Sequence, residues 1–385
     1  MNRAEFLVAS GAALAASLFG RRLLQGAERE PQEPLSLKSW EVVEYPRLPD
    51  RYKQFMKVTA SNGAFGVSRL VGGCKDLKAV EEIGRKTDLL DHEGLHDAMA
   101  AARIPFGQLA TFDIACWDLH ARMQNKPLHA LLGTKKTKIL RYGDVRGTQP
   151  DFSPDRYAAT VARYLQGTGL KATKLHFPGA MGTPESISFK QVLETLRAVR
   201  QAVGQEPILA WDPYPGSAES ATTSLDEAKQ ILKLMDELGY AWIEGPLPPV
   251  PFDKQIPKYV ELVTCGAKLK IQAEGPGSPI GDGTPFEVMK RWVKAGAVNQ
   301  CSTDAYIAPG VTNAVRMLEY ARSRPQRNLT INLHWAWAPH AHLVMAYEEK
   351  IVPFAEFPMV EDFPKTLLDG PYLLAPDWPG IYRVA

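Results

Sequence analysis

The chain has few cysteines and no apolar run long enough to span a membrane, and each absence excludes a class of protein. Its four cysteines lie far apart and include no CxxC pair. They indicate neither a zinc site nor a disulfide framework, and buried small apolar residues are the simpler interpretation. The N-terminal apolar stretch, residues 6–19, is 14 residues long, which is too short to cross a bilayer.

The chain also lacks a strong charge of either sign. Its net charge is +2, with 23% charged and 45% hydrophobic residues. This balance gives no electrostatic reason to expect nucleic acid or a membrane surface as a partner. No internal repeat or low-complexity segment interrupts the 385 residues, a length that accommodates a full barrel and an accessory domain.

The N-terminus differs from the rest of the chain. Arg3 precedes the apolar stretch, as in a signal peptide. The sequence RAEFL resembles the twin-arginine export motif, except that Ala4 replaces the second arginine, and no clear A-x-A cleavage site follows. We expect residues 1–35 to be a degenerate signal segment and spacer that exports the protein to the periplasm. The alternative is a cytoplasmic protein with a frayed extension.

Three carboxylates stand at the ends of three successive apolar runs. These are Asp212, Glu244 and Glu274, at intervals of 32 and 30 residues. Such an interval is the length of one strand, one helix and two loops, and it indicates βαβ units with a parallel sheet. In a closed barrel the strand ends converge at one mouth, where three acids repel one another unless a cation lies between them. Oxygen ligands that leave room for water or substrate favour Mg²⁺.

The chain divides into three parts after the spacer. Residues 36–135 predict a small α+β capping domain, residues 136–357 a modified (β/α)7β barrel of the TIM type, and residues 358–385 a tail that packs on the capping domain. Within the first part, Asn62-Gly63 predicts a hairpin turn, and Pro127 is expected to close the last helix. The barrel strands are expected at 136–147 and 170–176, before positions 212, 244, 274 and 304, and at 328–335 and 351–358.

Polar side chains stand where most of these strands end. In chain order they are His176, Asp212, Glu244, Glu274, Asp304, His334 and Glu356. Any parallel barrel has some polar residues at its loop ends, but an unbroken series of acids and imidazoles predicts a functional site.

The sequence resembles the enolase superfamily, in its mandelate racemase and muconate lactonizing branch. The segment FDIACWDLHARMQNKPLHALLG is similar to the signature helix of that family, and DGPYLLAPDWPG is similar to its closing segment. The resemblance implies that Asp212, Glu244 and Glu274 hold one Mg²⁺. It also implies that His334 transfers a proton and that Asp304 orients its imidazole.

Other positions depart from the family pattern or leave alternatives open. Relatives often carry Lys-x-Lys on the second strand, where this chain has Lys174-Leu175-His176. His176 acts as a base or acid whose pKa is depressed by Lys174, or it only hydrogen-bonds substrate.

Tyr214 either donates a proton to a leaving hydroxyl or packs against neighbouring side chains. By resemblance Glu356 hydrogen-bonds the substrate carboxylate; otherwise it is an ordinary strand-end acid. His340 and His342 are expected to be structural.

We expect a Mg²⁺-dependent enzyme that removes a proton next to a carboxylate and dehydrates a small sugar acid to a 2-keto-3-deoxy acid. The alternatives are a racemase or epimerase that uses His176 against His334, and a metal- and ligand-binding protein without turnover. Fold alone does not separate them. A homo-oligomer is also expected.

The export hypothesis is tested by fractionating cells that express the full chain. We expect the protein in the periplasmic fraction, because residues 1–35 carry the features of a signal segment. A variant that begins at residue 36 should stay in the cytosol. If the full chain were found only in the cytosol, the export hypothesis would be wrong.

Overall fold

The structure is a computed structural model, and it describes residues 34–45, 53–70, 77–147, 152–176, 187–213, 224–247, 252–273, 284–357 and 365–383. Two residues expected in the site, Tyr214 and Glu274, lie outside the described residues, as does nearly all of the expected signal segment and spacer. Within the described part of the chain, no helix is both long and apolar enough to cross a membrane.

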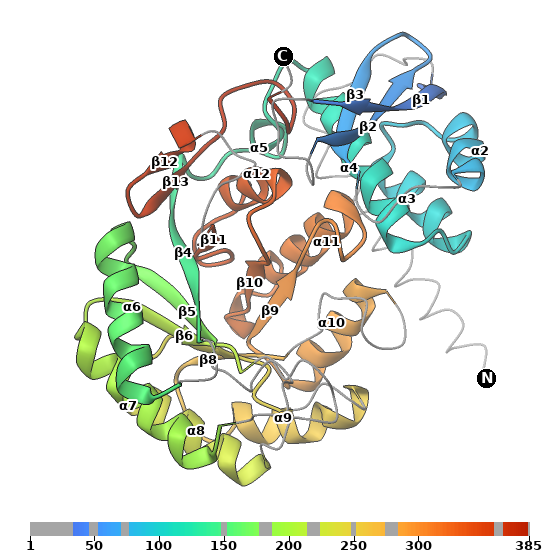
Figure 1. Ribbon diagram of the computed structural model, residues 1–385. Coiled ribbons are helices and arrows are strands. Elements are labelled where there is room, and N and C mark those ends of the chain that lie inside the picture. The colour runs from blue at the N-terminus through green and yellow to red at the C-terminus, as the bar shows by residue number, and fades with distance from the viewer. Residues whose placement is uncertain are drawn as a thin grey trace, which may run out of the picture.

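The N-terminal domain is a three-stranded antiparallel sheet covered by helices (Figure 1). Asn62-Gly63 makes the predicted turn between the second and third strands, with Gly63 at a φ of 87°. The third strand lies so close to the last helix that a Cβ on Gly66 would be 2.1 Å from the carbonyl oxygen of Ala115. The elements are β1 (Leu37–Glu44), β2 (Gln54–Ala60), β3 (Phe65–Arg69), α2 (Lys78–Lys86), α3 (His92–Ala101) and α4 (Phe106–Met123).

Helix α4 ends earlier than the position of Pro127 predicts. It stops at Met123, and Asn125 adopts a φ of 50°, a left-handed conformation that asparagine tolerates. Pro127 instead caps the short helix α5 (Leu128–Leu131). The expectation that Pro127 closes α4 was therefore wrong, because the chain turns before the proline ring can interfere.

The second part of the chain is a parallel barrel with helices on its outside (Figure 1). Neighbouring strands pair in parallel from β4 to β10, and β11 pairs with β4. The backbone N–H of Ile331 on β10 donates to the carbonyl of Ile351, at the start of the segment that leads to β11. The strands are β4 (Lys138–Arg146), β5 (Ala172–His176), β6 (Ile208–Trp211), β7 (Trp242–Glu244), β8 (Lys270–Gln272), β9 (Gln300–Thr303), β10 (Thr330–Leu333) and β11 (Ala355–Glu356).

Helix α8 (Leu225–Glu237) begins with a serine cap and a reciprocal hydrogen bond from its first turn. Ser224 accepts from the backbone N–H of Glu227, whose side chain accepts from the backbone of Ser224 in return, so both groups are satisfied. The helices are α6 (Pro154–Thr168), α7 (Phe189–Val203), α8 (Leu225–Glu237), α9 (Ile256–Val263), α10 (Pro285–Ala295), α11 (Gly310–Arg322) and α12 (Ala338–Ala346).

Aromatic side chains fill the barrel below its carboxyl-terminal mouth. The Trp242 ring stacks on Phe354 at 5.4 Å, and Tyr142 packs edge-on against Trp242 at 5.2 Å. Ala172 and Ala210 are buried with them. This cluster excludes water from beneath the strand ends, where the polar side chains gather.

The tail lies on the barrel as well as on the N-terminal domain. Its strands β12 (Leu368–Asp369) and β13 (Tyr372–Leu374) form an antiparallel extension of β4. Further on, the backbone N–H of Ile381 donates to Asp118 on α4. The sequence did not predict the pairing with β4, because the two segments lie far apart along the chain.

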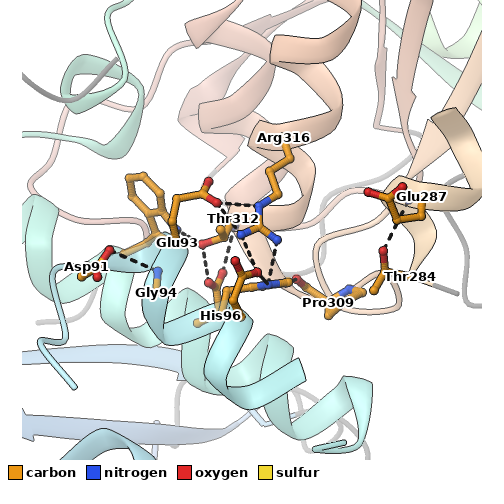
Figure 2. Close-up of polar contacts among 12 residues, drawn as sticks. Asp91, Glu93, Gly94, His96, Thr284, Glu287, Pro309, Thr312 and Arg316 are labelled. Carbon is orange, nitrogen blue, oxygen red and sulfur yellow. Dashed lines mark hydrogen bonds and ion pairs between the residues drawn. The ribbon is translucent and has the colours of Figure 1, made fainter. Parts of the chain in front are cut away.

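An ion-pair cluster joins α3 of the N-terminal domain to α11 of the barrel (Figure 2). Arg316 donates to Glu93 and, at 2.7 Å, to Asp97. The His96 ring contacts the carbonyl of Pro309 at 3.1 Å. Because Arg316 is largely buried while its acids are partly exposed, the cluster orients the domains more than it stabilises them.

Replacing Asp118 with Asn should lower the free energy of unfolding by about 3 kcal/mol. The buried carboxylate accepts from Val67 N–H at 2.8 Å, from Ile381 N–H and from Arg122 Nε at 2.6 Å. The change removes the charge that balances Arg122 and places an amide donor among other donors. Urea unfolding measures the loss. Asp377→Asn, an exposed change in the tail, should stay within about 0.5 kcal/mol, and an equal effect of both changes would contradict this account.

Candidate active site

Three carboxylates surround the Lys174 ammonium group at the carboxyl-terminal end of the barrel. Lys174 Nζ lies 3.1 Å from Glu244 Oε2, 3.4 Å from Glu356 Oε1 and 3.5 Å from Asp212 Oδ2. The lysine comes from β5, and the acids come from β7, from β11 and from directly after β6. Because these strands are parallel, their ends meet at one mouth, as the spacing predicts.

These groups are buried, so their charges interact strongly. The Lys174 side chain is 3% exposed. Burial alone would lower its pKa, but Glu244 and Glu356 outweigh this effect and raise the pKa well above its usual value. The pKa of Glu244 is raised to about 7. Burial is the largest cause, and the neighbouring acids Asp212 and Glu356 also raise this pKa, while Lys174 lowers it. The site therefore holds more negative charge than one ammonium group balances.

This surplus of negative charge fits a divalent cation. Asp212 and Glu244 already converge on one positive centre, and both offer the oxygen ligands that Mg²⁺ prefers. In the described part of the chain no group of three or more acidic, histidine or cysteine side chains is placed to hold a metal ion. The third expected ligand, Glu274, follows β8 and lies outside that part. Two of the three expected ligands thus come together.

His334 and Asp304 form a hydrogen-bonded pair beside these acids. His334 Nδ1 lies 2.9 Å from Asp304 Oδ2, as the sequence interpretation requires. Asp304 Oδ1 accepts from the backbone N–H groups of Tyr306 at 2.7 Å and Ile307 at 3.2 Å. The carboxylate is therefore held by the turn after β9 and orients the imidazole from behind.

The His334 side chain is 42% exposed, whereas Lys174 and Glu356 are each 3% exposed. A substrate in the mouth can therefore reach His334. The protein around the ring removes part of its water and so disfavours its charged form, but the hydrogen bond to Asp304 and the charge of Glu356 outweigh that effect and raise the pKa of His334 to about 9.

His340 supports both loops that carry this pair. The Ala305 N–H donates to its Nε2 at 2.9 Å, so Nδ1 carries the proton and donates to the Trp335 carbonyl at 2.9 Å. Burial lowers the pKa of His340, in keeping with this neutral form. Trp335 has a φ of 69°, and the hydrogen bond helps to hold that backbone conformation.

His176 lies between two carboxylates. Its Nε2 is 3.7 Å from Asp144 Oδ1, and its Nδ1 is 3.6 Å from Asp212 Oδ2. The expectation that Lys174 depresses the pKa of His176 was wrong in its net direction. Burial and Lys174 do lower that pKa, but the two acids outweigh them and the pKa is raised.

Three residues of this region were missed by the sequence interpretation. Asp144, on β4, is held at a pKa of about 2, since Lys174 and His176 outweigh the effect of its burial. The Tyr142 hydroxyl donates to Glu356 Oε2 at 3.0 Å. The Trp337 indole donates to Asp304 Oδ2 at 2.9 Å. Extending the list of strand-end polar residues to the first barrel strand would have found Asp144, whereas nothing in the sequence indicated Trp337.

Comparisons with known proteins agree with this architecture. The chain is 31% identical to a hydrophobic dipeptide epimerase of Roseobacter litoralis over 157 residues, 40% of each protein. It is 27% identical to an arabinonate dehydratase of Saccharolobus solfataricus over 207 residues, which cover 50% of this chain and 51% of that protein. The chain thus matches about half of those relatives or less.

A solved structure matches over nearly the whole chain. D-Glucarate dehydratase from Agrobacterium tumefaciens, complexed with magnesium, superposes with a TM-score of 0.72 at 23% identity, covering 91% of this chain and 96% of that one. The fold and the site define a parallel (β/α) barrel with buried acids and a histidine–aspartate pair at its carboxyl-terminal mouth. The enolase C-terminal domain-like family model matches residues 156–381. The chain therefore belongs to the enolase superfamily, in its mandelate racemase-like branch.

Magnesium binding should weaken as the pH falls from 8 to 6. Glu244 has a pKa of about 7 in the metal-free protein, and only its ionised form binds the metal. Below pH 7, each unit of pH should lower the affinity by up to about tenfold. Calorimetric titration with MgCl₂ at pH 6, 7 and 8 measures this. Glu244→Gln should weaken binding strongly, whereas the exposed change Glu237→Gln should not. An affinity independent of pH would contradict the assignment.

Proposed function

We propose that this protein dehydrates a sugar acid to a 2-keto-3-deoxy acid by removing the proton next to the carboxylate. The observation that carries the proposal is the exposed His334 imidazole, hydrogen-bonded at Nδ1 to the buried Asp304. A dehydration needs one firm acid–base group, and this pair supplies it. Similarity to an arabinonate dehydratase and to a D-glucarate dehydratase supports the same reaction class.

His334 acts through the ring nitrogen that faces away from Asp304. Because Asp304 accepts the hydrogen bond of Nδ1, the neutral ring carries its proton there and leaves the Nε2 lone pair for the substrate. Nε2 takes the α-proton, and the C–H electrons move toward the carboxylate. Asp304 then stabilises the imidazolium that forms, without itself taking the proton.

Asp212, Glu244 and Glu274 would hold one Mg²⁺. When bound, that ion supplies positive charge where the substrate carboxylate becomes more negative, and it lowers the pKa of His334 toward the working pH. Lys174 and Glu356 lie at the same mouth, paired at 3.4 Å. They supply buried charge beneath the mouth in which a small sugar acid would bind.

Loss of the β-hydroxyl completes the reaction. The C–O bond breaks as the C=C bond forms, a proton joins the departing oxygen to give water, and the enol rearranges to the keto acid. His334 can return the proton that it took, or His176 or Tyr214 can supply one. Of these alternatives, His176 has the geometry of a charged donor, since it lies 3.6 to 3.7 Å from two carboxylates.

The second candidate is racemisation or epimerisation. His176 and His334 would then exchange protons with opposite faces of the substrate. This candidate is favoured by the acids that flank His176 and by similarity to a hydrophobic dipeptide epimerase. A metal- and ligand-binding protein without turnover is the third outcome that an assay must separate.

Purified full-length protein, incubated with Mg²⁺ and a panel of sugar acids in D₂O, should produce a 2-keto-3-deoxy acid. His334→Asn should reduce the rate by at least about 10³-fold, because the proton acceptor is lost, and EDTA should abolish turnover. NMR of the products measures the reaction. Asp377→Asn serves as a control with unchanged activity, and circular dichroism confirms that each variant is folded.

The other outcomes separate the alternatives. Incorporation of α-deuterium with inversion, and without a keto acid, would support the racemase. Mg²⁺-dependent ligand binding without turnover would support the binding protein. Full activity in His334→Asn would refute the role of His334.

A further inference from the structure

Trp337 connects the His334–Asp304 pair to the N-terminal domain. Its indole N–H donates to Asp304 Oδ2 at 2.9 Å, the same oxygen that lies 2.9 Å from His334 Nδ1. The guanidinium carbon of Arg69 lies 4.5 Å from the centre of the Trp337 ring. Arg69 is the last residue of β3, so a cation–π contact from one domain reaches a side chain that bonds to the acid–base pair of the other.

A second contact holds the same indole. The Tyr306 ring packs edge-on against Trp337 at 5.1 Å, and the Tyr306 hydroxyl is hydrogen-bonded to Tyr382 in the tail. The backbone N–H of Tyr306 donates to Asp304. Trp337 therefore contacts Arg69 from β3 and Tyr306 from the loop after β9, and Tyr306 is in turn bonded to the tail.

Trp337 and His334 share one oxygen of Asp304, and this sharing affects the basicity of His334. Two donors compete for the charge on Asp304 Oδ2, so the indole takes part of the stabilisation that the imidazolium of His334 would otherwise receive. The indole also fixes the plane of the carboxylate, and thereby the direction in which His334 presents Nε2. A rigid ring is suited to this role because it loses little conformational freedom.

We propose that Trp337 is a positioning residue for the His334–Asp304 pair, and that Arg69 holds Trp337 in place from the N-terminal domain. The inference rests on the proposed role of His334 as the proton acceptor. The N-terminal domain then takes part in the proton transfer, because the packing of β3 against the barrel affects the basicity of His334 and the orientation of its Nε2.

Other charged groups also face His334, and the experiment has to keep them constant. They are Glu356 on β11, Lys174 on β5 and Glu244 on β7, with the neutral His340 ring on α12. All variants therefore leave these residues unchanged, and the titrations use the magnesium-free protein.

The test is an NMR titration of the His334 ring in the full chain without substrate. Trp337→Phe keeps a smaller aromatic ring beside Arg69 and removes the N–H donor. We expect the pKa of His334 to rise by about half a unit or more, since Asp304 Oδ2 regains charge. Trp40→Phe is the matched control, because that indole also donates to a carboxylate, Glu81, but far from the pair. An unchanged pKa in Trp337→Phe would overturn the proposal.

Arg69 is tested by a double-mutant cycle. Arg69→Met should raise the pKa of His334, and Arg69→Lys, which keeps a cation over the ring, should restore most of the original value. If Arg69 acts through Trp337, adding Arg69→Met to Trp337→Phe should cause little further shift. Additive shifts would mean that Arg69 acts by its own charge, which would overturn its assigned role.

A kinetic measurement completes the test once a substrate is known. Trp337→Phe should lower kcat about tenfold with KM within about twofold, because the pair is misdirected while the substrate contacts remain. A change in KM alone would indicate a substrate contact and refute the positioning role. If no sugar acid is turned over, the proposed function fails, yet the titration still decides whether Trp337 and Arg69 control His334.

Discussion

The candidate site depends on the interaction of the buried Lys174 ammonium group with the carboxylates around it. Asp212, Glu244 and Glu356 lie within 3.1 to 3.5 Å of it, and three carboxylates gathered around one buried group repel one another in a dry environment. Lys174 offsets part of that repulsion, but it leaves Glu244 with a pKa of about 7. The barrel therefore holds a surplus of buried negative charge that a divalent cation would offset, at a cost to the stability of the metal-free protein.

The surrounding structure keeps this charge dry and oriented. Trp242, Phe354 and Tyr142 close the barrel below the site, so that the charges interact across protein rather than water. Above it, the His334–Asp304 pair is held by backbone donors and by Trp337. The N-terminal domain reaches that support through Arg69, whose guanidinium lies over the Trp337 ring.

The sequence by itself determined the architecture and most of the site. Acids and imidazoles recurred about one βα unit apart, and a parallel barrel brings such positions to one mouth. The approach of Asp212 and Glu244 to one point follows from that period, and the pairing of Asp304 with His334 is the one that the family resemblance implies. The family resemblance could also be recognised from the sequence, because Asp113 and Asp118 stand at fixed spacing on one buried helix.

Only the tertiary structure decided which of several plausible partners each group has. The net direction of the His176 shift depends on the balance between burial, one ammonium group and two acids, and spacing does not specify that balance. The contact of Arg69 with Trp337, and the pairing of the tail with β4, join segments hundreds of residues apart. Such contacts depend on how domains dock and on where side chains turn, and local sequence patterns encode strand and helix periods but not these approaches.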